Sequence, residues 1–290
     1  MTETYAEGMS DVAIESNSDL SQAKAPEKLA PHTYGVESLP EAASNFGIVV
    51  GEEAVVVVDS RLTPALGHEL RGWLADNVLG EKRPILINSH FHGDHWFGNP
   101  GFKGDTIIAS RWTQEKLRQD WEIQVERFCE LRPHQTEDFR SVTPVLPNIG
   151  IEQDAILDLG GTSVRVQCVR HAHSPGDVIV WSDDDRVAFA GDLVVNGHWP
   201  AFPHADYQGW LAVLTELADS GVRTVVPGHG PIGGVEVVRT MIDCLRFLEE
   251  LASRPEAEWD GLVAASPYAD WLHPIRVHPA IKHIRNELSE

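Results

Sequence analysis

The stretch His90-Phe91-His92-Gly93-Asp94-His95 follows a short apolar run at residues 84–88, with Ser89 between them. Three imidazoles and one carboxylate within six residues are a typical ligand set for Zn²⁺ and suit iron or manganese equally well. In an extended segment, side chains two positions apart point to the same side, so His90 and His92 can reach one ion. Gly93 permits a turn that directs the last two residues toward a second ion. The stretch therefore predicts a metal site at the end of a strand, where α/β folds bind ligands.

Three later apolar runs also lead into a histidine or an aspartate. These residues are His173 in His171-Ala172-His173-Ser174-Pro175-Gly176, Asp192 in Ala190-Gly191-Asp192, and His229 in Pro227-Gly228-His229-Gly230. Neighbouring glycines let the backbone approach a shared centre, and at the first of these segments His171 is an alternative ligand. Together the four strand ends supply enough ligands for two ions with a position left open for water: His90, His92, Asp94, His95, His173, Asp192 and His229.

The order of these motifs resembles the metallo-β-lactamase superfamily of metallohydrolases, and the resemblance covers residues 45–234. It implies an α/β (α+β) fold built as a four-layer αββα metallo-β-lactamase-like sandwich. It also implies that His173 is the ligand rather than His171, because in the family the ligand immediately precedes the Ser or Thr of this turn. The implied arrangement is one ion held by His90, His92 and His173, a second ion held by Asp94, His95 and His229, and Asp192 bridging the two.

Three segments, at residues 45–50, 88–99 and 191–194, are most similar to one branch of this superfamily. That branch includes the metal-dependent cyclase/thioesterases of aromatic polyketide pathways and many uncharacterised bacterial hydrolases. The chain differs from the secreted true β-lactamases, because it shows no export signal and has no Cys at the Asp192 position. It also lacks a clear C-terminal glutathione-binding helical domain such as glyoxalase II carries.

Two ions about 3.5–4 Å apart can share a water molecule and lower its pKa from ~15.7 to near 7. We therefore predict a dinuclear metal-dependent hydrolase whose metal-bridging hydroxide attacks an ester, thioester, lactone or amide-type bond of a small molecule. Asp94 is the predicted catalytic residue, orienting the nucleophile and relaying a proton to the leaving group. The predicted cofactor is two Zn²⁺ per chain, with iron or manganese as alternatives. A serine hydrolase is disfavoured because the chain contains no GxSxG motif.

Two other functions would use the same residues. A dinuclear iron oxidoreductase or oxygenase on this scaffold is compatible with the ligands, since His and carboxylate bind iron well. A non-catalytic, metal-stabilised binding protein is disfavoured by the completeness of the ligand set. A nuclease is opposed by the net charge of −21, because such a surface repels a phosphate backbone.

The composition also indicates partners and compartment. The three cysteines contain no CxxC pair, which excludes a disulfide scaffold and fits a reducing compartment. The N-terminal segment has no apolar core typical of a secretory signal, and the aliphatic runs are too short to span a bilayer. We predict a cytoplasmic protein that acts on a small molecule and has no nucleic-acid or membrane partner. The sequence is compatible with a homo-oligomer.

The hydrophobic pattern predicts a disordered acidic tail over residues 1–30 and a single domain over residues 31–290. Residues 111–140 are expected to form a helical insert, as a lid beside the site or a dimer face. Strands are expected at residues 46–50, 54–59, 84–88, 155–159, 163–169, 178–181, 187–190 and 222–226, and helices at 64–79, 207–219, 235–251 and 280–288. This alternation is typical of layered sheets covered by helices.

Trp96 and His198 are the candidates for substrate binding. Trp96 follows the metal loop and either packs beneath it or contacts substrate. His198 either belongs to the pocket wall, where it could donate a proton, or is an ordinary loop residue, and the same applies to the nearby His204. The histidines outside ligand-like segments are expected to be surface or packing residues: His32, His68, His134, His273, His278 and His283.

Overall fold

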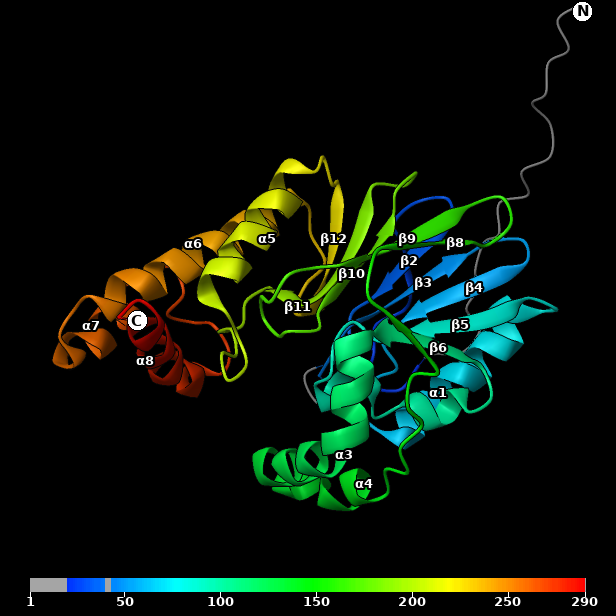
Figure 1. Cartoon of the computed structure of the whole chain (residues 1–290), viewed down its shortest axis with the longest axis horizontal. Helices are drawn as coiled ribbons and strands as arrows, with labels where there is room; N and C mark the ends of the chain where they lie inside the picture. Colours follow the sequence, from blue (N-terminus) through cyan, green and yellow to red (C-terminus); the bar gives the residue numbers. More distant parts are fainter. Residues whose placement is uncertain (1–19, 40–42, 290) are drawn as a thin grey trace, which may run out of the picture.

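The computed structural model describes residues 20–39 and 43–289 of the chain. Two mixed β-sheets pack face to face, and helices cover both outer faces (Figure 1). The first sheet has the strand order β1-β2-β3-β4-β5-β6-β7, and the second has the order β12-β11-β10-β9-β8. This is the four-layer αββα arrangement that the sequence predicts.

The first sheet is antiparallel from β1 to β4 and parallel from β4 to β7. Every residue of β3 and β4 is buried, because these Val-rich strands are covered on both faces. The strands are β1 (Glu27–Lys28), β2 (Thr33–Val36), β3 (Phe46–Val50), β4 (Ala54–Val58), β5 (Arg83–Ile87), β6 (Thr106–Ser110) and β7 (Ile149–Ile151).

The second sheet is antiparallel except for the pair β11–β12, which is parallel. Its strands are β8 (Ala155–Asp158), β9 (Ser163–Cys168), β10 (Val178–Ser182), β11 (Val187–Val195) and β12 (Thr224–His229). β11 runs beyond its predicted end at residue 190, with a shift in register at Gly191. Asp192 therefore lies within a strand, and His229 is the last residue of the neighbouring one.

Three large hydrophobic cores hold the described sheets and helices together, and a smaller fourth core lies beside the metal loop. One core lies between the sheets, a second joins the first sheet to α1, and a third joins the second sheet to α5, α6 and α8. The helices are α1 (Pro64–Leu74), α2 (Gly93–Trp96), α3 (Arg111–Leu131), α4 (Thr136–Arg140), α5 (Tyr207–Asp219), α6 (Val235–Ala252), α7 (Trp259–Ala264) and α8 (Val277–Glu287). A π-helical turn, η2 (Ala75–Leu79), extends α1, and 3₁₀ turns lie at η3 (Asn99–Phe102), η4 (Pro133–Gln135), η5 (Glu256–Glu258) and η6 (Pro274–Arg276).

The segment at residues 111–140 is helical, as predicted, and packs beside the metal loop. α3 bends at Asp120, whose backbone dihedral angles (φ −126°, ψ 15°) are not helical. Beyond the bend, Phe128 joins Phe97 and Phe139 in a small aromatic core. The second half of α3 is thereby held against the loop that carries the predicted ligands.

Residues 20–30 correct the predicted boundary of the tail. Leu20 is only 4% exposed and packs in the core of the first sheet, and β1 pairs with β2. The buried guanidinium of Arg61 explains part of this order, because it donates to the carbonyl of Ser21 and pairs with Glu69 at 2.8 Å. The remainder of the predicted tail, residues 1–19, lies outside the described residues.

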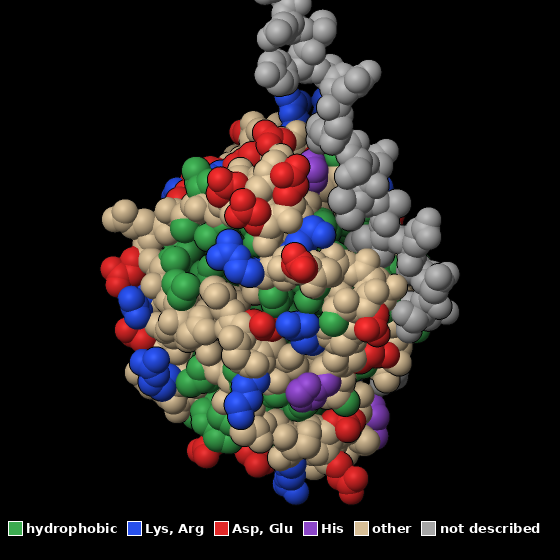
Figure 2. All heavy atoms as spheres, turned by 90° about the vertical axis from the view of Figure 1, so that its right-hand side faces the viewer, with side chains coloured by type: hydrophobic (Ala, Val, Ile, Leu, Met, Phe, Trp, Pro, Cys, Tyr) green, Lys and Arg blue, Asp and Glu red, His purple; other side chains and the backbone are tan. Residues whose placement is uncertain are grey.

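Among the described residues, no helix combines the length and the apolar composition needed to cross a membrane. On the face shown in Figure 2, Asp and Glu side chains lie among Lys and Arg side chains. That mixed pattern differs from the continuous basic surface typical of nucleic-acid binding.

Candidate metal centre

All seven predicted ligands converge at one edge of the two facing sheets. The loop after β5 supplies His90 and His92, and α2, which follows directly, supplies Asp94 and His95. The other three come from the loop after β9 and from the strands β11 and β12, namely His173, Asp192 and His229. Each of the seven is at most 8% exposed, so the sites lie in a low-dielectric environment.

The first group of ligand atoms comprises His90, His92, His173 and Asp192. The Nε2 atom of His90 lies 3.1 Å from Nδ1 of His92. Asp192 Oδ2 lies 4.0 Å from His90 Nε2 and 3.8 Å from His173 Nε2. One ligand atom from each residue falls within 4.8 Å of all the others, as ligands around a common ion do.

The second group comprises Asp94, His95 and His229. Asp94 Oδ2 lies 3.2 Å from Nε2 of His229 and 3.8 Å from Nε2 of His95. The same two Nε2 atoms each lie 3.2 Å from Oδ1 of Asp192. Asp192 therefore presents one oxygen to each group, which is the position that a bridging ligand requires.

Each of the five imidazoles has its second ring nitrogen engaged by a neighbour. The partners are Ser89 Oγ for His90 (3.0 Å), His204 Nδ1 for His92 (3.1 Å), Asp59 Oδ2 for His95 (2.7 Å), Asp177 Oδ1 for His173 (3.4 Å) and the Ala43 carbonyl for His229 (3.0 Å). Such outer contacts fix ring orientation and tautomer in metal sites. They leave one nitrogen of each ring facing the centre.

Several atoms that face the centre make no hydrogen bond of good geometry with a described residue, although two of them, Nε2 of His95 and Oδ1 of Asp192, lie 3.2 Å apart. They are Nε2 of His95, Nε2 of His173 and Oδ1 of Asp192, all of them buried. Leaving buried polar atoms unsatisfied is costly, and coordination of a cation would satisfy them. The donor set of imidazole nitrogens and carboxylate oxygens fits two divalent transition-metal ions.

The pKa shifts differ between the two groups. Burial lowers the pKa of His90 and of His92 well below the ordinary value, and nearby histidines add to that effect. In the second group burial also opposes the charged imidazolium, but carboxylates outweigh it. Asp59, Asp94 and Asp192 raise the pKa of His95 well above the ordinary value, and Asp192 and Asp94 raise that of His229 to about 9. In the metal-free protein the imidazoles of His90 and His92 are therefore neutral, whereas those of His95 and His229 are protonated.

Close backbone approach at the centre requires glycine at residue 228. A Cβ added at Gly228 would lie 2.1 Å from Oδ1 of Asp192 and 2.8 Å from the carbonyl carbon of Gly191. Gly191 itself has φ of 51°, in the left-handed region that favours glycine. The glycines beside Asp192 and His229 thus let two adjacent strands bring their ligands together.

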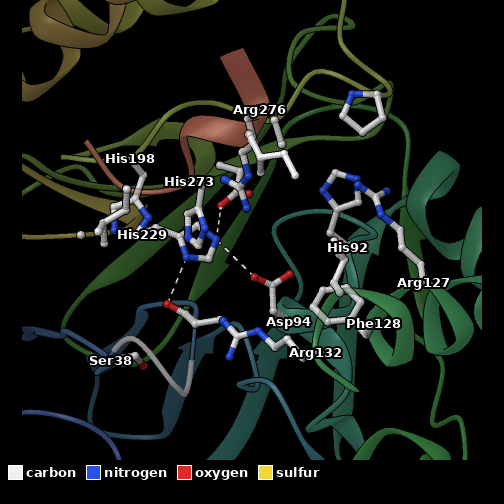
Figure 3. Close-up of a pocket in the computed structure, with 18 of the residues that line it drawn as sticks. Ser38, His92, Asp94, Arg127, Phe128, Arg132, His198, His229, His273 and Arg276 are labelled. Carbon is white, nitrogen blue, oxygen red and sulfur yellow. Dashed lines mark hydrogen bonds and ion pairs between the residues drawn. The ribbon is translucent and has the colours of Figure 1, made fainter. Parts of the chain in front are cut away.

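The centre opens into a cavity of about 1070 Å³ (Figure 3). His92, Asp94, Asp192 and His229 form part of its wall. The second half of α3, the loop after β11 and the segment around η6 form further parts, and residues of the N-terminal segment and of the loop after β12 also line it. A cavity of this size can bury most of a small organic molecule next to the ligand groups.

The two substrate-binding candidates are placed differently. His198 lines the cavity, its ring 5.7 Å from that of His229, and burial lowers its pKa to about 3. Trp96 is fully buried and donates from Nε1 to the carbonyl of Phe91, so it packs beneath the metal loop and the expectation that it contacts substrate is wrong. His171 lies outside both ligand groups, and its Nε2 contacts the carbonyl of His204 instead.

Sequence analysis missed several residues around the centre. His273, expected at the surface or in packing, lines the cavity with its ring 5.4 Å from that of His198. It does so because Leu272 pairs with the chain at Gly197 and Trp199. Asp59 was missed although it directly follows the apolar strand β4 at the same edge of the sheet, which is the signal that could have identified it.

The family model described as Metallo-beta-lactamase superfamily matches residues 39–229 of the chain. A curated relative, Metallo-beta-lactamase type 2 from Bacteroides fragilis, is 22% identical over 259 residues, spanning 85% of this chain and 94% of the relative. The human protein named Acyl-coenzyme A thioesterase MBLAC2 is 29% identical over 213 residues, spanning 67% of this chain and 75% of that protein.

Among solved structures, a metallo-beta-lactamase from Pontibacter korlensis has a TM-score of 0.60 and 19% identity, covering 78% of this chain and 99% of its own. The DIM-1 metallo-beta-lactamase has a TM-score of 0.60 and 15% identity, covering 79% of this chain and 99% of its own. These likenesses show the fold.

Proposed function

Because this chain belongs to the metallo-beta-lactamase superfamily and is a metal-dependent hydrolase with a candidate dinuclear His/Asp site, we propose that it cleaves an acyl bond of a small molecule. The bonds in question are ester, thioester, lactone and amide-type bonds, and the proposed metal is zinc, two ions per chain. The observation that carries the proposal is the position of Asp192, with one oxygen facing each ligand group beside an open cavity.

Two divalent ions bound in these groups would supply Lewis acidity and an activated water molecule at neutral pH. The chain's own residues do the rest. Asp94 lines the cavity and has a pKa well below the ordinary value, because His95 and His229 outweigh the effect of its burial. Its carboxylate can orient the attacking water and then pass a proton to the departing group.

His198 is proposed as a neutral part of the pocket wall. Burial, together with His229 and His273, lowers its pKa to about 3, so the ring is uncharged at neutral pH. An uncharged ring cannot serve as a strong proton donor, but its N–H can still bind a substrate oxygen. This favours the pocket-wall role over the proton-donor role considered from the sequence.

The named relatives support two members of the substrate class. A relative described as an acyl-coenzyme A thioesterase favours testing thioesters, and one described as a metallo-beta-lactamase favours testing a cyclic amide. The chain matches the thioesterase at higher identity and the lactamase over a greater length. We therefore rank thioesters first and include β-lactams in the same test.

The test combines metal analysis with a substrate panel. Purified protein is expected to contain about two zinc ions per chain, to hydrolyse thioester or lactone substrates, and to lose activity on chelation and regain it with Zn²⁺. The Asp192→Asn variant should lose turnover while remaining folded. A protein without transition metal that Zn²⁺ does not activate would refute the proposal, and iron content with oxygen consumption would support the oxidoreductase alternative.

We retain the predictions that the protein is cytoplasmic and acts without a nucleic-acid partner. The mixture of charges in Figure 2 and the net charge of −21 support the second prediction. Cell fractionation tests the compartment, and light scattering of the purified protein tests for a homo-oligomer.

A further inference from the structure

Three arginines line the cavity beside the ligand groups. Arg127 and Arg132 come from the end of α3 and the residue that follows it, and Arg276 comes from η6. Figure 3 shows them on different sides of Asp94, with the guanidinium of Arg127 beside His92. Lys24, which pairs with Glu37, and the carboxylates of Asp94, Glu130 and Asp192 also belong to the wall, so its charges are mixed before metal binds.

Among the described residues, Arg127 and Arg276 have no carboxylate partner within ion-pair distance, unlike several other arginines of this acidic protein. Elsewhere Arg71 pairs with Asp105 and Arg165 pairs with Asp183. Arg127 makes no hydrogen bond to a described residue, and Arg276 donates from Nη1 to the carbonyl of Trp199. Both therefore have N–H groups available at the cavity.

The metal ligands do not supply the missing anion once the centre is loaded. The carboxylates of Asp192 and Asp94 interact electrostatically with Arg276, and that of Asp94 also interacts with Arg127. Two divalent ions bring more positive charge than these two carboxylates neutralise. A loaded centre therefore leaves the arginines facing a net positive charge, and an anion entering the cavity would balance it.

Apolar side chains gather at the same cavity. Of the eight exposed large hydrophobic residues in the described chain, four line it: Leu39, Leu131, Leu272 and Ile275. Ile275 is 84% exposed and Leu131 is 63% exposed, although each is adjacent in sequence to a cavity arginine. Arginine and exposed aliphatic side chains thus lie next to each other in the same two wall segments.

We infer that the substrate is an amphipathic anion, whose carboxylate or phosphate group is bound by Arg127 and Arg276 and whose apolar part lies on Leu131 and Ile275. The inference rests on the proposed hydrolase function and specifies its substrate class. Guanidinium groups bind planar or multidentate oxyanions through paired hydrogen bonds. The scissile bond then lies between the arginines and the metal ligands, within the reach of Asp94.

The kinetic test uses thioesters that differ only in charge. One member of each pair carries a free carboxylate, and its control is the methyl ester of the same compound. Two such pairs are made: one has the carboxylate on the leaving thiol, and the other has it on the far end of the acyl chain. A third member carries phosphate in place of carboxylate and distinguishes the two oxyanions. Each compound is prepared with an acetyl-length and an octanoyl-length apolar part.

The wild type is expected to prefer the anionic long-chain compound in one of the two placements by at least about tenfold in kcat/KM. Arg127→Gln and Arg276→Gln should each reduce that preference about 10- to 100-fold, mainly through KM, and change the uncharged control by less than about twofold. Arg276→Lys should retain part of the preference. Arg140→Gln removes an arginine that pairs with Glu126 outside the cavity, and it should change nothing.

Leu131→Asn and Ile275→Asn test the apolar part. Each should reduce the advantage of the long chain over the short one without altering the preference for charge. Equal kcat/KM for charged and uncharged compounds in both placements would overturn the inference, as would arginine variants that slow both compounds equally.

A binding measurement separates this inference from the proposed reaction. Thioether analogues, which cannot be hydrolysed, are titrated calorimetrically into metal-loaded and metal-free protein. If no thioester is cleaved but the anionic thioether binds in an Arg127- and Arg276-dependent way, the reaction is refuted and the anion site is supported. If thioesters are cleaved and the thioethers bind regardless of charge, the reaction is supported and the anion site is refuted.

Discussion

At the scale of single residues, the centre depends on contacts behind its ligands as much as on the ligands. Asp59 Oδ2 lies 2.7 Å from Nδ1 of His95, and the same carboxylate accepts from the backbone and the hydroxyl of Ser89. Asp59 adopts a φ of 66°, unusual for a non-glycine residue, and the contacts it makes hold it there. It positions His95 without being a ligand itself.

Replacing Asp59 with Asn should lower the metal affinity of the second ligand group by about 10- to 100-fold, because His95 loses the carboxylate that orients its ring. After dialysis against a weak chelator, the variant should retain about one zinc ion where the wild type retains two. Asp105→Asn, which removes a carboxylate paired with Arg71 away from the centre, is the matched control. Full retention of both ions by the Asp59 variant would contradict the positioning role.

The opposite pKa shifts in the two groups predict different pH dependence for the two ions. The second ion must displace protons from His95 and from His229, whose pKa is raised to about 9, whereas the first meets neutral His90 and His92. Between about pH 6 and 9, affinity for the second ion should rise by roughly tenfold per pH unit for each proton displaced, and affinity for the first should change much less. Zinc titration of metal-free protein against a chelating dye at several pH values measures this, and equal slopes for both ions would contradict it.

At the scale of elements, the centre forms where strand ends from two sheets meet. β11 and β12 run in parallel, so Asp192 and His229 approach the same edge, and Gly228 allows the two strands to lie close at that point. No side chain larger than hydrogen fits at this position without moving Asp192.

Gly228→Ala should therefore displace Asp192 and remove metal from both groups, because Asp192 serves both. We expect a loss of at least about 100-fold in activity and substoichiometric metal. Gly72→Ala is the control, since a Cβ at this position in α1 meets nothing within 4 Å. Because Gly72 lies in a helix interior, its replacement by Ala should stabilise the fold by up to about 1 kcal/mol. The measured Tm of this control should therefore be unchanged or raised. Normal metal content in the Gly228 variant would contradict this reading of the strand pair.

At the scale of the whole molecule, the ions should contribute to stability, because their ligands come from segments spread from the first sheet to the second. Binding to the folded state alone stabilises a protein by about 4 kcal/mol per site when free metal is 1,000 times Kd. For a chain of this size, chelation should lower Tm by about 5–10 °C or more, and Zn²⁺ should restore it. In the Asp192→Ala variant, chelator should leave Tm nearly unchanged. If chelator lowers the Tm of this variant as much as that of the wild type, the stabilisation is not due to this centre.

Elements with strong local signals were predicted well. The bounds of β3 and α5 match the structure, because one is a Val- and Ile-rich run and the other is an amphipathic stretch capped by Asp206. Short strands such as β6 and β7 were not predicted, since five or three residues carry little pattern of their own and are held by pairing with neighbours.

The seven ligands could be predicted from the sequence because each stands in a short glycine-flanked motif at the end of an apolar run, where local chemistry and chain order carry the information. The tertiary structure alone decided what faces them. Arg127 in α3 is far in the chain from His273 and Arg276 at η6, and none of the three has a local signature of its role. They meet the centre because α3 bends at Asp120 and residue 272 pairs with the chain near Trp199. A motif specifies ligands through short-range spacing, whereas a cavity wall is set by how distant elements pack.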